Sequence, residues 1–158
     1  MNILVKYASQ RDLEQVNRLR RQVNDVHVTG RPDMFRPGFC EEMQRHLYEQ
    51  FERADADILV ACLGETIVGF ATVEYVTKPL SPYSLERRFY QVEEFGVDEQ
   101  YRRQGVATAL VEFMRQDAKK RGFDRIELDM WEFNQGALKF YESAGFTTYR
   151  RYMELNLP

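Results

Sequence analysis

The chain has 158 residues and a formal net charge of −3, and 44% of its residues are hydrophobic and 13% aromatic. This apolar content is enough to offset the conformational entropy lost on ordering, so the composition excludes a disordered chain and a collagen-like repeat. The length predicts a single domain over residues 1–158. Charges of both signs are scattered along the chain, without the basic stripe typical of nucleic-acid binding, and we expect no nucleic-acid partner.

The apolar runs are too short for a membrane segment. The longest, such as residues 58–63, are strand-sized, whereas crossing a bilayer takes ~20 residues. Lys6 and Tyr7 follow the first apolar residues at once, which leaves no room for the core of a signal peptide. We therefore expect a cytoplasmic protein with no membrane partner. Cys40 and Cys62 are too few for a disulfide framework and lack metal-ligand spacing, so we expect two small buried side chains and no metal.

The first part of the chain predicts one strand and two helices. Ile3, Val5 and Tyr7 alternate with smaller or polar neighbours, as in a short strand. Ser9 is suited to cap the helix that follows, because its side-chain oxygen can accept a hydrogen bond from a free backbone N–H group. Asp12, three residues later, places negative charge in the first turn, where it suits the helix dipole. Apolar residues recur at helical spacing at Val16, Leu19, Val23 and Val26. Glycines and prolines make residues 29–38 a loop, and an apolar residue at every fourth position over 39–51 predicts the second helix.

The middle of the chain predicts strands. Residues 58–63 and 66–75 are rich in Ile, Val and Phe and flank a glycine-containing turn, which is typical of a hairpin. Two prolines make residues 78–82 a loop, since proline cannot donate to a strand ladder. The next strand is predicted over residues 89–97.

The last part predicts two helices and two strands. A long helix carries its apolar stripe at Ala107, Leu110, Val111, Met114 and Ala118 and ends at Gly122. Residues 126–130 alternate as a strand, Asn134 caps a short helix that Gly145 ends, and Met153, Leu155 and Leu157 mark a closing strand. The order β-α-α-β-β-β-α-β-α-β predicts a mixed α/β (α+β) fold with its strands joined in one sheet packed by helices.

The turn before the long helix is the clearest candidate for ligand binding. Gly105 and Ala107 leave little side chain near the backbone, so an anionic group can approach the free N–H groups of the first helical turn. The helix dipole and the nearby Arg102 and Arg103 favour negative charge there. On these residues alone, a glycine that only eases a tight turn is an equal alternative. Neither the dinucleotide fingerprint nor the P-loop motif is present.

Two segments resemble the signatures of one enzyme family. Arg102-x-x-Gly105-x-Ala107, after a strand ending Phe95-Gly96-Val97, resembles the acetyl-CoA pyrophosphate loop of the GNAT superfamily of N-acetyltransferases. Residues 134–146, with an Asn and an Ala followed by a Tyr-containing helix and Gly-Phe, are similar to that family's other signature. The similarity runs from about residue 89 to the end and is only topological before it. The resemblance implies a central, mostly antiparallel twisted sheet flanked by helices.

The resemblance also implies roles for single residues. Backbone amides from Arg103 to Thr108 would hold the pyrophosphate, and the amide of Val97 would face the thioester oxygen, where a donor stabilises the developing oxyanion. Asn134 would contact the cofactor arm, and Tyr141 would protonate the departing thiolate. Spacing alone would make Tyr141 a core aromatic. The implied cofactor-binding set is Phe95, Val97, Arg102, Arg103, Gln104, Gly105, Val106, Ala107, Thr108 and Asn134.

Glu93 and Glu94 are candidates for the base that deprotonates the amine. Charged pairs are disfavoured in mid-strand, and strict alternation sends one carboxylate to each face of the sheet. One of them would then line a cleft and could accept a proton directly or through water. The family often places an acidic residue here, and we rank Glu93 before Glu94. A solvated or salt-bridged pair is the equal alternative.

These observations predict an acetyl-CoA-dependent N-acetyltransferase that acts by direct attack in a ternary complex. A small-molecule primary amine is the default acceptor, and peptide or protein amines remain alternatives, because the first half of the chain carries no acceptor signature. His27 and Trp131 are candidates for the acceptor site, although core packing is the first expectation for Trp131. The closing strand could support a homodimer. The rival functions are an inactive acyl-CoA-binding or regulatory module and a nucleotide-binding domain.

Overall fold

The computed structural model describes residues 2–158 and contains a five-stranded sheet in the order β1-β2-β3-β4-β5. The strands are β1 (Leu4–Tyr7), β2 (Ala56–Leu63), β3 (Thr66–Lys78), β4 (Arg87–Val97) and β5 (Ile126–Leu128). The helices are α1 (Leu13–Gly30), α2 (Glu41–Phe51), α3 (Val106–Lys120) and α4 (Gln135–Ser143). Neighbouring strands from β1 to β4 are antiparallel, and β5 runs parallel to β4. This architecture confirms the predicted mixed α/β class.

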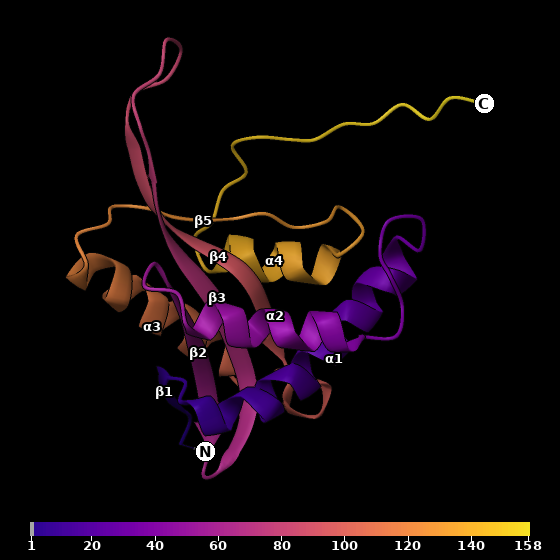
Figure 1. Ribbon diagram of the computed structural model, residues 1–158, viewed down its shortest axis with the longest axis vertical. Helices are drawn as coiled ribbons and strands as arrows, with labels where there is room; N and C mark the ends of the chain where they lie inside the picture. Colours follow the sequence, from indigo (N-terminus) through magenta and orange to yellow (C-terminus); the bar gives the residue numbers. More distant parts are fainter. Residues whose placement is uncertain (1) are drawn as a thin grey trace.

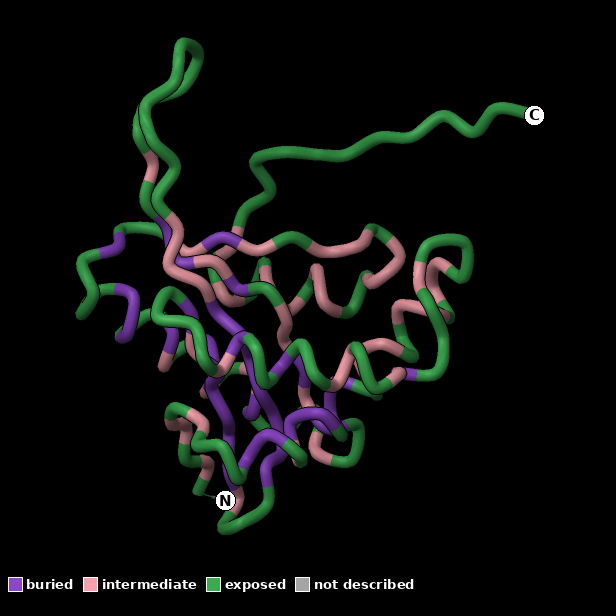
Figure 2. Tube along the Cα trace, viewed as in Figure 1, coloured by how far each residue is buried: buried purple, intermediate pink, exposed green. Residues whose placement is uncertain are grey.

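Helices cover both faces of the sheet (Figure 1). One face packs against α1 and α2 through buried residues that include Leu13, Leu47 and Phe70. The other packs against α3 through residues that include Leu110 and Tyr90. The strand β2 and residues 67–73 of β3 are buried on both sides and form the centre of the molecule (Figure 2). Their apolar content follows from this position, because a sheet covered on both faces has no solvated side.

A β-bulge in β4 changes which way its side chains point. The register passes from Thr72↔Glu94 to Val73↔Val92, so Glu93 is the extra residue. Val92 packs in the α3 cluster, whereas the carboxylates of both Glu93 and Glu94 reach partners on α1 or α2. The prediction that alternation sends one carboxylate to each face is therefore wrong. Because the bulge adds one residue to β4, the side chains of Glu93 and Glu94 do not point to opposite faces of the sheet. Both carboxylates lie on the face that packs against α1 and α2.

Most local signals led to the expected elements. Ser9 precedes the first helical turn as predicted, and its amide and hydroxyl donate to the Asp12 carboxylate, although this turn is a short 3-10 helix (Gln10–Asp12) ahead of α1. Gly122 adopts a φ of +83° at the end of α3, and the Asn134 side chain accepts a hydrogen bond from the amide of Ala137 at the start of α4. The helix α1 continues to Gly30, two residues into the predicted loop.

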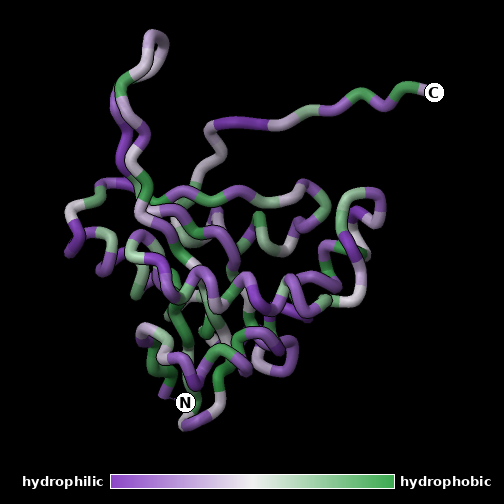
Figure 3. Tube along the Cα trace, viewed as in Figure 1, coloured by the Kyte–Doolittle hydropathy of each residue, from purple (hydrophilic) through white to green (hydrophobic). Residues whose placement is uncertain are grey.

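The predicted closing strand is absent. Residues 147–158 form no strand in the described chain and pass beyond α4 as an exposed segment (Figure 1), with side-chain bonds from Tyr149 to Glu127 and from Arg31 to Glu154. The reason is the lack of a partner, since a strand exists only when its backbone groups pair with a neighbour. The hairpin that joins β3 to β4 projects from the same side of the molecule. Both segments are exposed and contain apolar positions (Figures 2 and 3).

No helix within residues 2–158 combines the length and the hydropathy of a membrane-spanning segment. Both cysteines are free thiols. Cys62 is buried in the α1–α2 cluster as expected, but Cys40 is only partly buried at the start of α2.

Candidate active site

The sheet opens where β5 leaves β4. The two strands pair only over residues 90–92 of β4, whereas β3 accompanies β4 to its end. The amide of Asp98 donates to the carbonyl of Val68 on β3 at 2.8 Å. Because successive amides of a strand point to opposite sides, those of Phe95 and Val97 point to the side that β5 has left. An extended ligand could therefore accept hydrogen bonds from β4 at this opening.

The N-terminus of α3 presents unpaired backbone donors. Arg103 and Gly105 have φ values of +63° and +88°, and this turn leads directly into the helix. Within residues 2–158, no amide from Arg103 to Thr108 donates to a backbone acceptor. A methyl group added at Gly105 would meet no atom within 4 Å, so glycine is required here by its φ value and not by crowding. The geometry and the helix dipole suit an anionic group such as a pyrophosphate.

Close packing holds this helix end beside the opening. A Cβ atom built on Gly69 of β3 would lie 2.6 Å from Cγ1 of Val106, so only glycine allows α3 to approach the sheet so closely. Gly69 is the register partner of Val97. The unpaired amides of α3 and the end of β4 are thus fixed relative to each other.

Tyr141 reaches the opening from α4. Its ring packs edge-on against three phenylalanine rings. The distances between ring centroids are 6.0 Å to Phe95 of β4, 5.6 Å to Phe140 and 5.7 Å to Phe146. Burial in this aromatic setting raises the pKa of Tyr141 to about 12, because the charged phenolate is poorly solvated. The hydroxyl group therefore keeps its proton at neutral pH, as an acid must before it donates.

Glu94 is committed to an ion pair with Arg20 of α1. The carboxylate accepts hydrogen bonds from Nε and Nη2 of Arg20 at 2.7 and 3.3 Å. The Arg20 side chain is buried and also donates to Oδ1 of Asn17 and to the carbonyl of Met43, both at 2.8 Å. Four hydrogen bonds thus engage the guanidinium group, and two of them are charge-assisted bonds to Glu94.

Glu93 lies in a different environment. Nε2 of Gln50 on α2 donates to its carboxylate at 3.0 Å. Glu93 is exposed by its surface area, but partial desolvation of its carboxylate, followed by the charge of Glu74, raises its pKa to about 7, and Arg53 acts in the opposite direction. Arg53 is itself paired with Glu74 at 2.8 Å, which weakens its effect on Glu93. Of the two bulge carboxylates, Glu93 thus has a pKa matched to proton transfer near neutral pH.

The amide group of Gln50 is only half satisfied. Gln50 is 2% exposed, and its Oε1 is the buried side-chain oxygen that lacks a hydrogen-bond partner within residues 2–158. A buried acceptor without a partner is costly, and the protonated form of Glu93 is the neighbouring group that could supply a donor.

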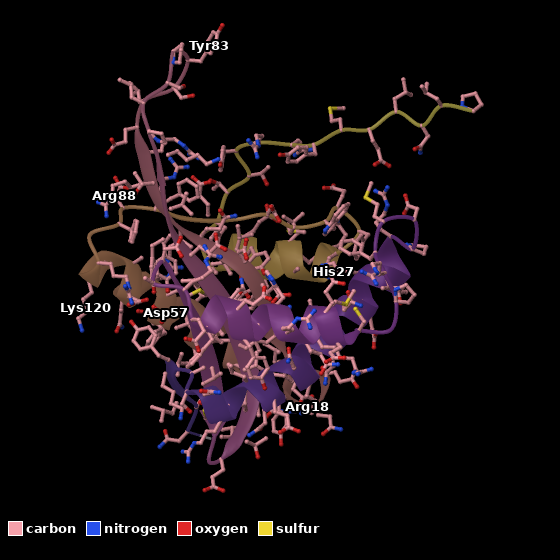
Figure 4. All side chains as sticks on the ribbon, viewed as in Figure 1. Arg18, His27, Asp57, Tyr83, Arg88 and Lys120 are labelled. Atoms are coloured by element: carbon pink, nitrogen blue, oxygen red, sulfur yellow. The ribbon has the colours of Figure 1, made fainter. Side chains whose placement is uncertain are left out.

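Aromatic side chains gather at the end of α1. The ring of His27 stacks on that of Phe35, with 4.9 Å between the ring centroids, and Phe35 packs edge-on against Trp131, with 5.1 Å between centroids. Phe133 contacts both His27 and Trp131, at 6.2 and 6.4 Å, and Figure 4 shows His27 beneath the segment that precedes α4. Burial lowers the pKa of His27, partly offset by the charge of Glu94. Trp131 belongs to this group and to neither sheet core, contrary to the expectation of core packing.

The structure places the candidate bases and the candidate acid on opposite faces of the sheet at β4. The carboxylates lie on the α1–α2 side, and Phe95 and Tyr141 lie on the side of α3 and α4. Arg20 and Gln50 were not predicted. The sequence does contain a sign of their burial. Arg20 follows Val16 by four residues and Gln50 follows Leu47 by three, so each polar side chain lies on the apolar stripe of its helix.

Comparisons with known proteins agree with this geometry. The model of the acetyltransferase (GNAT) family matches residues 24–146. The L-amino acid N-acetyltransferase AaaT of Escherichia coli is 27% identical over 154 residues, which cover 91% of this chain and 82% of that protein. The solved structure of a tetramutant of the BH1408 protein from Bacillus halodurans is 29% identical, with a TM-score of 0.91 over 98% of this chain and 99% of that chain.

The same fold occurs in more distant structures. AAC(6')-Iy, solved in complex with the bisubstrate analogue CoA-S-monomethyl-acetylneamine, superposes with a TM-score of 0.78 at 16% identity, over 100% of this chain and 99% of that one. At this level of identity the likeness concerns the fold alone.

Proposed function

Because the chain belongs to the acetyltransferase (GNAT) family, we propose that it transfers an acetyl group from acetyl-CoA to a primary amine of a small molecule. The observation that carries this proposal is the opening between β4 and β5, with a carboxylate of pKa about 7 on one side and a protonated tyrosine on the other. An acid and a base with such separated pKa values suit a reaction that removes one proton and delivers another.

The unpaired donors bind acetyl-CoA in this proposal. The amides from Arg103 to Thr108 hold the pyrophosphate, with Arg102 and the side chains of this turn at its rim, and the amides of Phe95 and Val97 pair with the pantetheine arm. Asn134 contacts the same arm. The Val97 amide donates to the thioester carbonyl, and this bond strengthens as negative charge develops on the oxygen.

Proton transfer is divided between the two sides of the sheet. Glu93 accepts a proton from the incoming ammonium group, and the free amine then attacks the thioester carbon. As the tetrahedral intermediate collapses, the C–S bond breaks and Tyr141 donates its proton to the departing sulfur. The nitrogen then releases its second proton through water to the Tyr141 phenolate, which leaves the neutral amide and restores the acid. Glu94 is the second candidate for the base, but its bond to Arg20 makes Glu93 the better one. No covalent enzyme intermediate is required.

The choice of acceptor follows from the charge of the site and from one relative. Two carboxylates on one face of the opening favour a cationic amine, and the E. coli relative is named an L-amino acid N-acetyltransferase. We therefore take free amino acids as the first acceptors to test, followed by other small amines, an aminoglycoside and a lysine-containing peptide.

Thiol release with this panel of amines, measured alongside calorimetric titration with acetyl-CoA, tests the proposal. We expect binding of acetyl-CoA and amine-dependent release of CoA for at least one acceptor. Binding without release for any amine would indicate an acyl-CoA-binding module. The absence of binding would overturn the proposal, and equal thermal stabilisation by CoA and ATP would favour a nucleotide-binding domain.

A further inference from the structure

A buried carboxylate holds the chain that joins β4 to the first turn of α3. Asp98 directly follows β4 and is 3% exposed. Its Oδ1 accepts a hydrogen bond from the amide of Gln100 at 3.1 Å, and its own amide donates to the carbonyl of Val68 on β3 at 2.8 Å. The amide of Tyr101 donates to the Asp98 carbonyl at 2.8 Å. The side chain and the backbone of one residue thus fix the first bend after the strand.

Two side chains of α1 bind this carboxylate and the chain around it. Nη1 of Arg18 donates to Oδ2 of Asp98 at 2.9 Å, and Nε2 of Gln22 donates to Oδ1 at 3.4 Å. Nη2 of Arg18 donates to the carbonyl of Ile67 on β3 at 3.2 Å. Oε1 of Gln22 accepts from the amide of Glu99 at 3.1 Å. Arg18 and Gln22 are four residues apart on one side of α1, and in Figure 4 Arg18 lies where this helix passes the chain that follows β4.

The bonds to Asp98 outweigh the cost of burying its charge. Burial alone would raise the pKa of Asp98, because the charged form loses solvation. The bonds from Arg18, from the Gln100 amide and from Gln22 act in the opposite direction and hold the pKa of Asp98 below its ordinary value. The carboxylate is therefore charged at neutral pH and bound at both oxygens. Loss of the Arg18 donor would leave a buried charge partly unpaired, which is costly.

Close packing places α1 against the last residues of β4. A Cβ atom built on Gly96 would lie 2.6 Å from Cγ2 of Val23 on α1, so only glycine allows the helix to approach the strand so closely. Val97 lies between Gly96 and Asp98, and α1 thus contacts both of its neighbours in the chain. The amide of Val97 is the donor that points to the side that β5 has left.

The end of β4 is held from both faces of the sheet. On the face of α1, Arg20 bonds to Glu94 four residues before Asp98. On the other face, Val106 at the start of α3 packs against Gly69, the register partner of Val97. The donors at residue 97 and at residues 103–108 are therefore restrained before any ligand binds. Donors that are already in place need no reorganisation during the reaction.

We propose that Arg18, Gln22 and Asp98 are positioning residues for acetyl-CoA. They fix the spacing between the Val97 amide and the amides of residues 103–108, so that the thioester carbonyl and the pyrophosphate of one acetyl-CoA molecule reach both sets of donors together. Binding then costs less ordering of the protein. The three side chains act through the backbone and touch no reacting atom. This role rests on the proposed acetyl transfer and adds the residues that maintain its geometry.

Calorimetric titration of the full-length protein with acetyl-CoA tests this role. Arg18→Met keeps the aliphatic stem of the side chain and removes both donors. We expect it to raise the dissociation constant of acetyl-CoA at least tenfold, which corresponds to about 1.4 kcal/mol, and to lower kcat, while the KM for the amine stays nearly unchanged. Gln22→Leu keeps the ion pair between Arg18 and Asp98, and it should weaken acetyl-CoA binding by a smaller factor.

Arg121→Met is the matched control. Nε of Arg121 lies 3.0 Å from the carboxylate of Asp117, whose side chain is 4% exposed, as is that of Asp98, but this pair is at the C-terminal end of α3. We expect Arg18→Met and Arg121→Met both to lower the free energy of unfolding in chemical denaturation. Only Arg18→Met should also lose affinity for acetyl-CoA.

A double-mutant cycle supplies the second readout. Because Arg18 and Asp98 act as one unit, the chain that carries both Arg18→Met and Asp98→Asn should bind acetyl-CoA no more weakly than the weaker of the two single variants. Single effects that multiply in the double variant would overturn the proposal. So would acetyl-CoA affinities of Arg18→Met and Gln22→Leu that equal that of Arg121→Met, even when the unmodified chain transfers acetyl groups. No binding of acetyl-CoA by the unmodified chain would overturn the proposed function, and this role with it.

Discussion

At the scale of single residues, Glu93 combines a catalytic advantage with a cost in stability. Its pKa in the folded protein, about 7, exceeds the ordinary value near 4.5, so the native state favours the protonated form. Folding stability therefore decreases as the pH rises through the window between these two values. The same shift makes the carboxylate a better base near neutral pH than an ordinary glutamate would be.

Replacement of Glu93 by Gln should separate the two effects. We expect kcat/KM of the unmodified enzyme to rise with pH through about 7, because the base must be deprotonated, and we expect Glu93→Gln to lose most of this activity. At pH 8 the variant should be more stable by about 1 kcal/mol, since a partly solvated group realises only part of its shift. Rate profiles and chemical denaturation from pH 5 to 9 measure both. An unchanged rate profile would exclude Glu93 as the base.

Gln50 should help to set the pH midpoint of the kcat/KM profile that Glu93 produces. Its Nε2 donates to the Glu93 carboxylate, and a hydrogen bond to the charged form lowers a pKa. We expect Gln50→Leu to shift the midpoint of the kcat/KM profile to higher pH while leaving acetyl-CoA affinity unchanged. The stability cost should be small, because the substitution also removes the unpartnered Oε1. A profile that loses amplitude without moving would contradict this role.

Tyr141 should be required for turnover but not for folding. Tyr141→Phe keeps the ring contacts with Phe95 and Phe146 and removes only the hydroxyl group. We expect kcat to fall about 100-fold or more, with acetyl-CoA affinity and the melting temperature nearly unchanged. Phe140→Leu is a useful comparison, since it perturbs the same aromatic contacts without removing a proton donor. A Tyr141→Phe enzyme of normal kcat would refute the assignment.

At the scale of elements, the two ends of α3 offer a matched pair of glycines. Gly105 and Gly122 have φ values of +88° and +83°, and neither has an atom within 4 Å of an added Cβ. Alanine should therefore cost each site about 1 kcal/mol of backbone strain. Only Gly105→Ala should also weaken acetyl-CoA binding in calorimetry, because only that turn carries the unpaired donors. Equal affinities for the two variants would contradict the pyrophosphate site.

The elements also show what could be predicted from sequence. Capping residues, apolar periodicity and the glycine turns depend on neighbours in the chain, and they placed α3, α4 and the β2–β3 hairpin correctly. The β4 bulge could not be predicted, because it is a mismatch between Val92–Glu94 and the separate strand β3. The closing strand was predicted from its own alternation, although strand formation depends on a partner. Arg20 and Gln50 required the three-dimensional pairing of α1 and α2 with the bulge.

At the scale of the whole molecule, binding of acetyl-CoA should slow amide exchange more on the side of α3 and α4 than on the side of α1 and α2. The proposed contacts lie at the end of β4, at the first turn of α3 and near α4, whereas α1 and α2 lie across the sheet. We expect saturating CoA to slow amide exchange at residues 95–97 and 103–108 and in α4, with little change in α2. Uniform slowing, or protection confined to α1 and α2, would contradict the proposed binding mode.

The two packing clusters on opposite faces of the sheet have a consequence for engineering. Substitutions at sites that are far apart and share no neighbours combine additively, and β2 and β3 separate the α1–α2 residues from those of α3. A mutant library confined to α1, α2 and the loop between them should therefore diversify the range of amines accepted while sparing the machinery on α3. Directed evolution of new specificities should begin in that half of the chain.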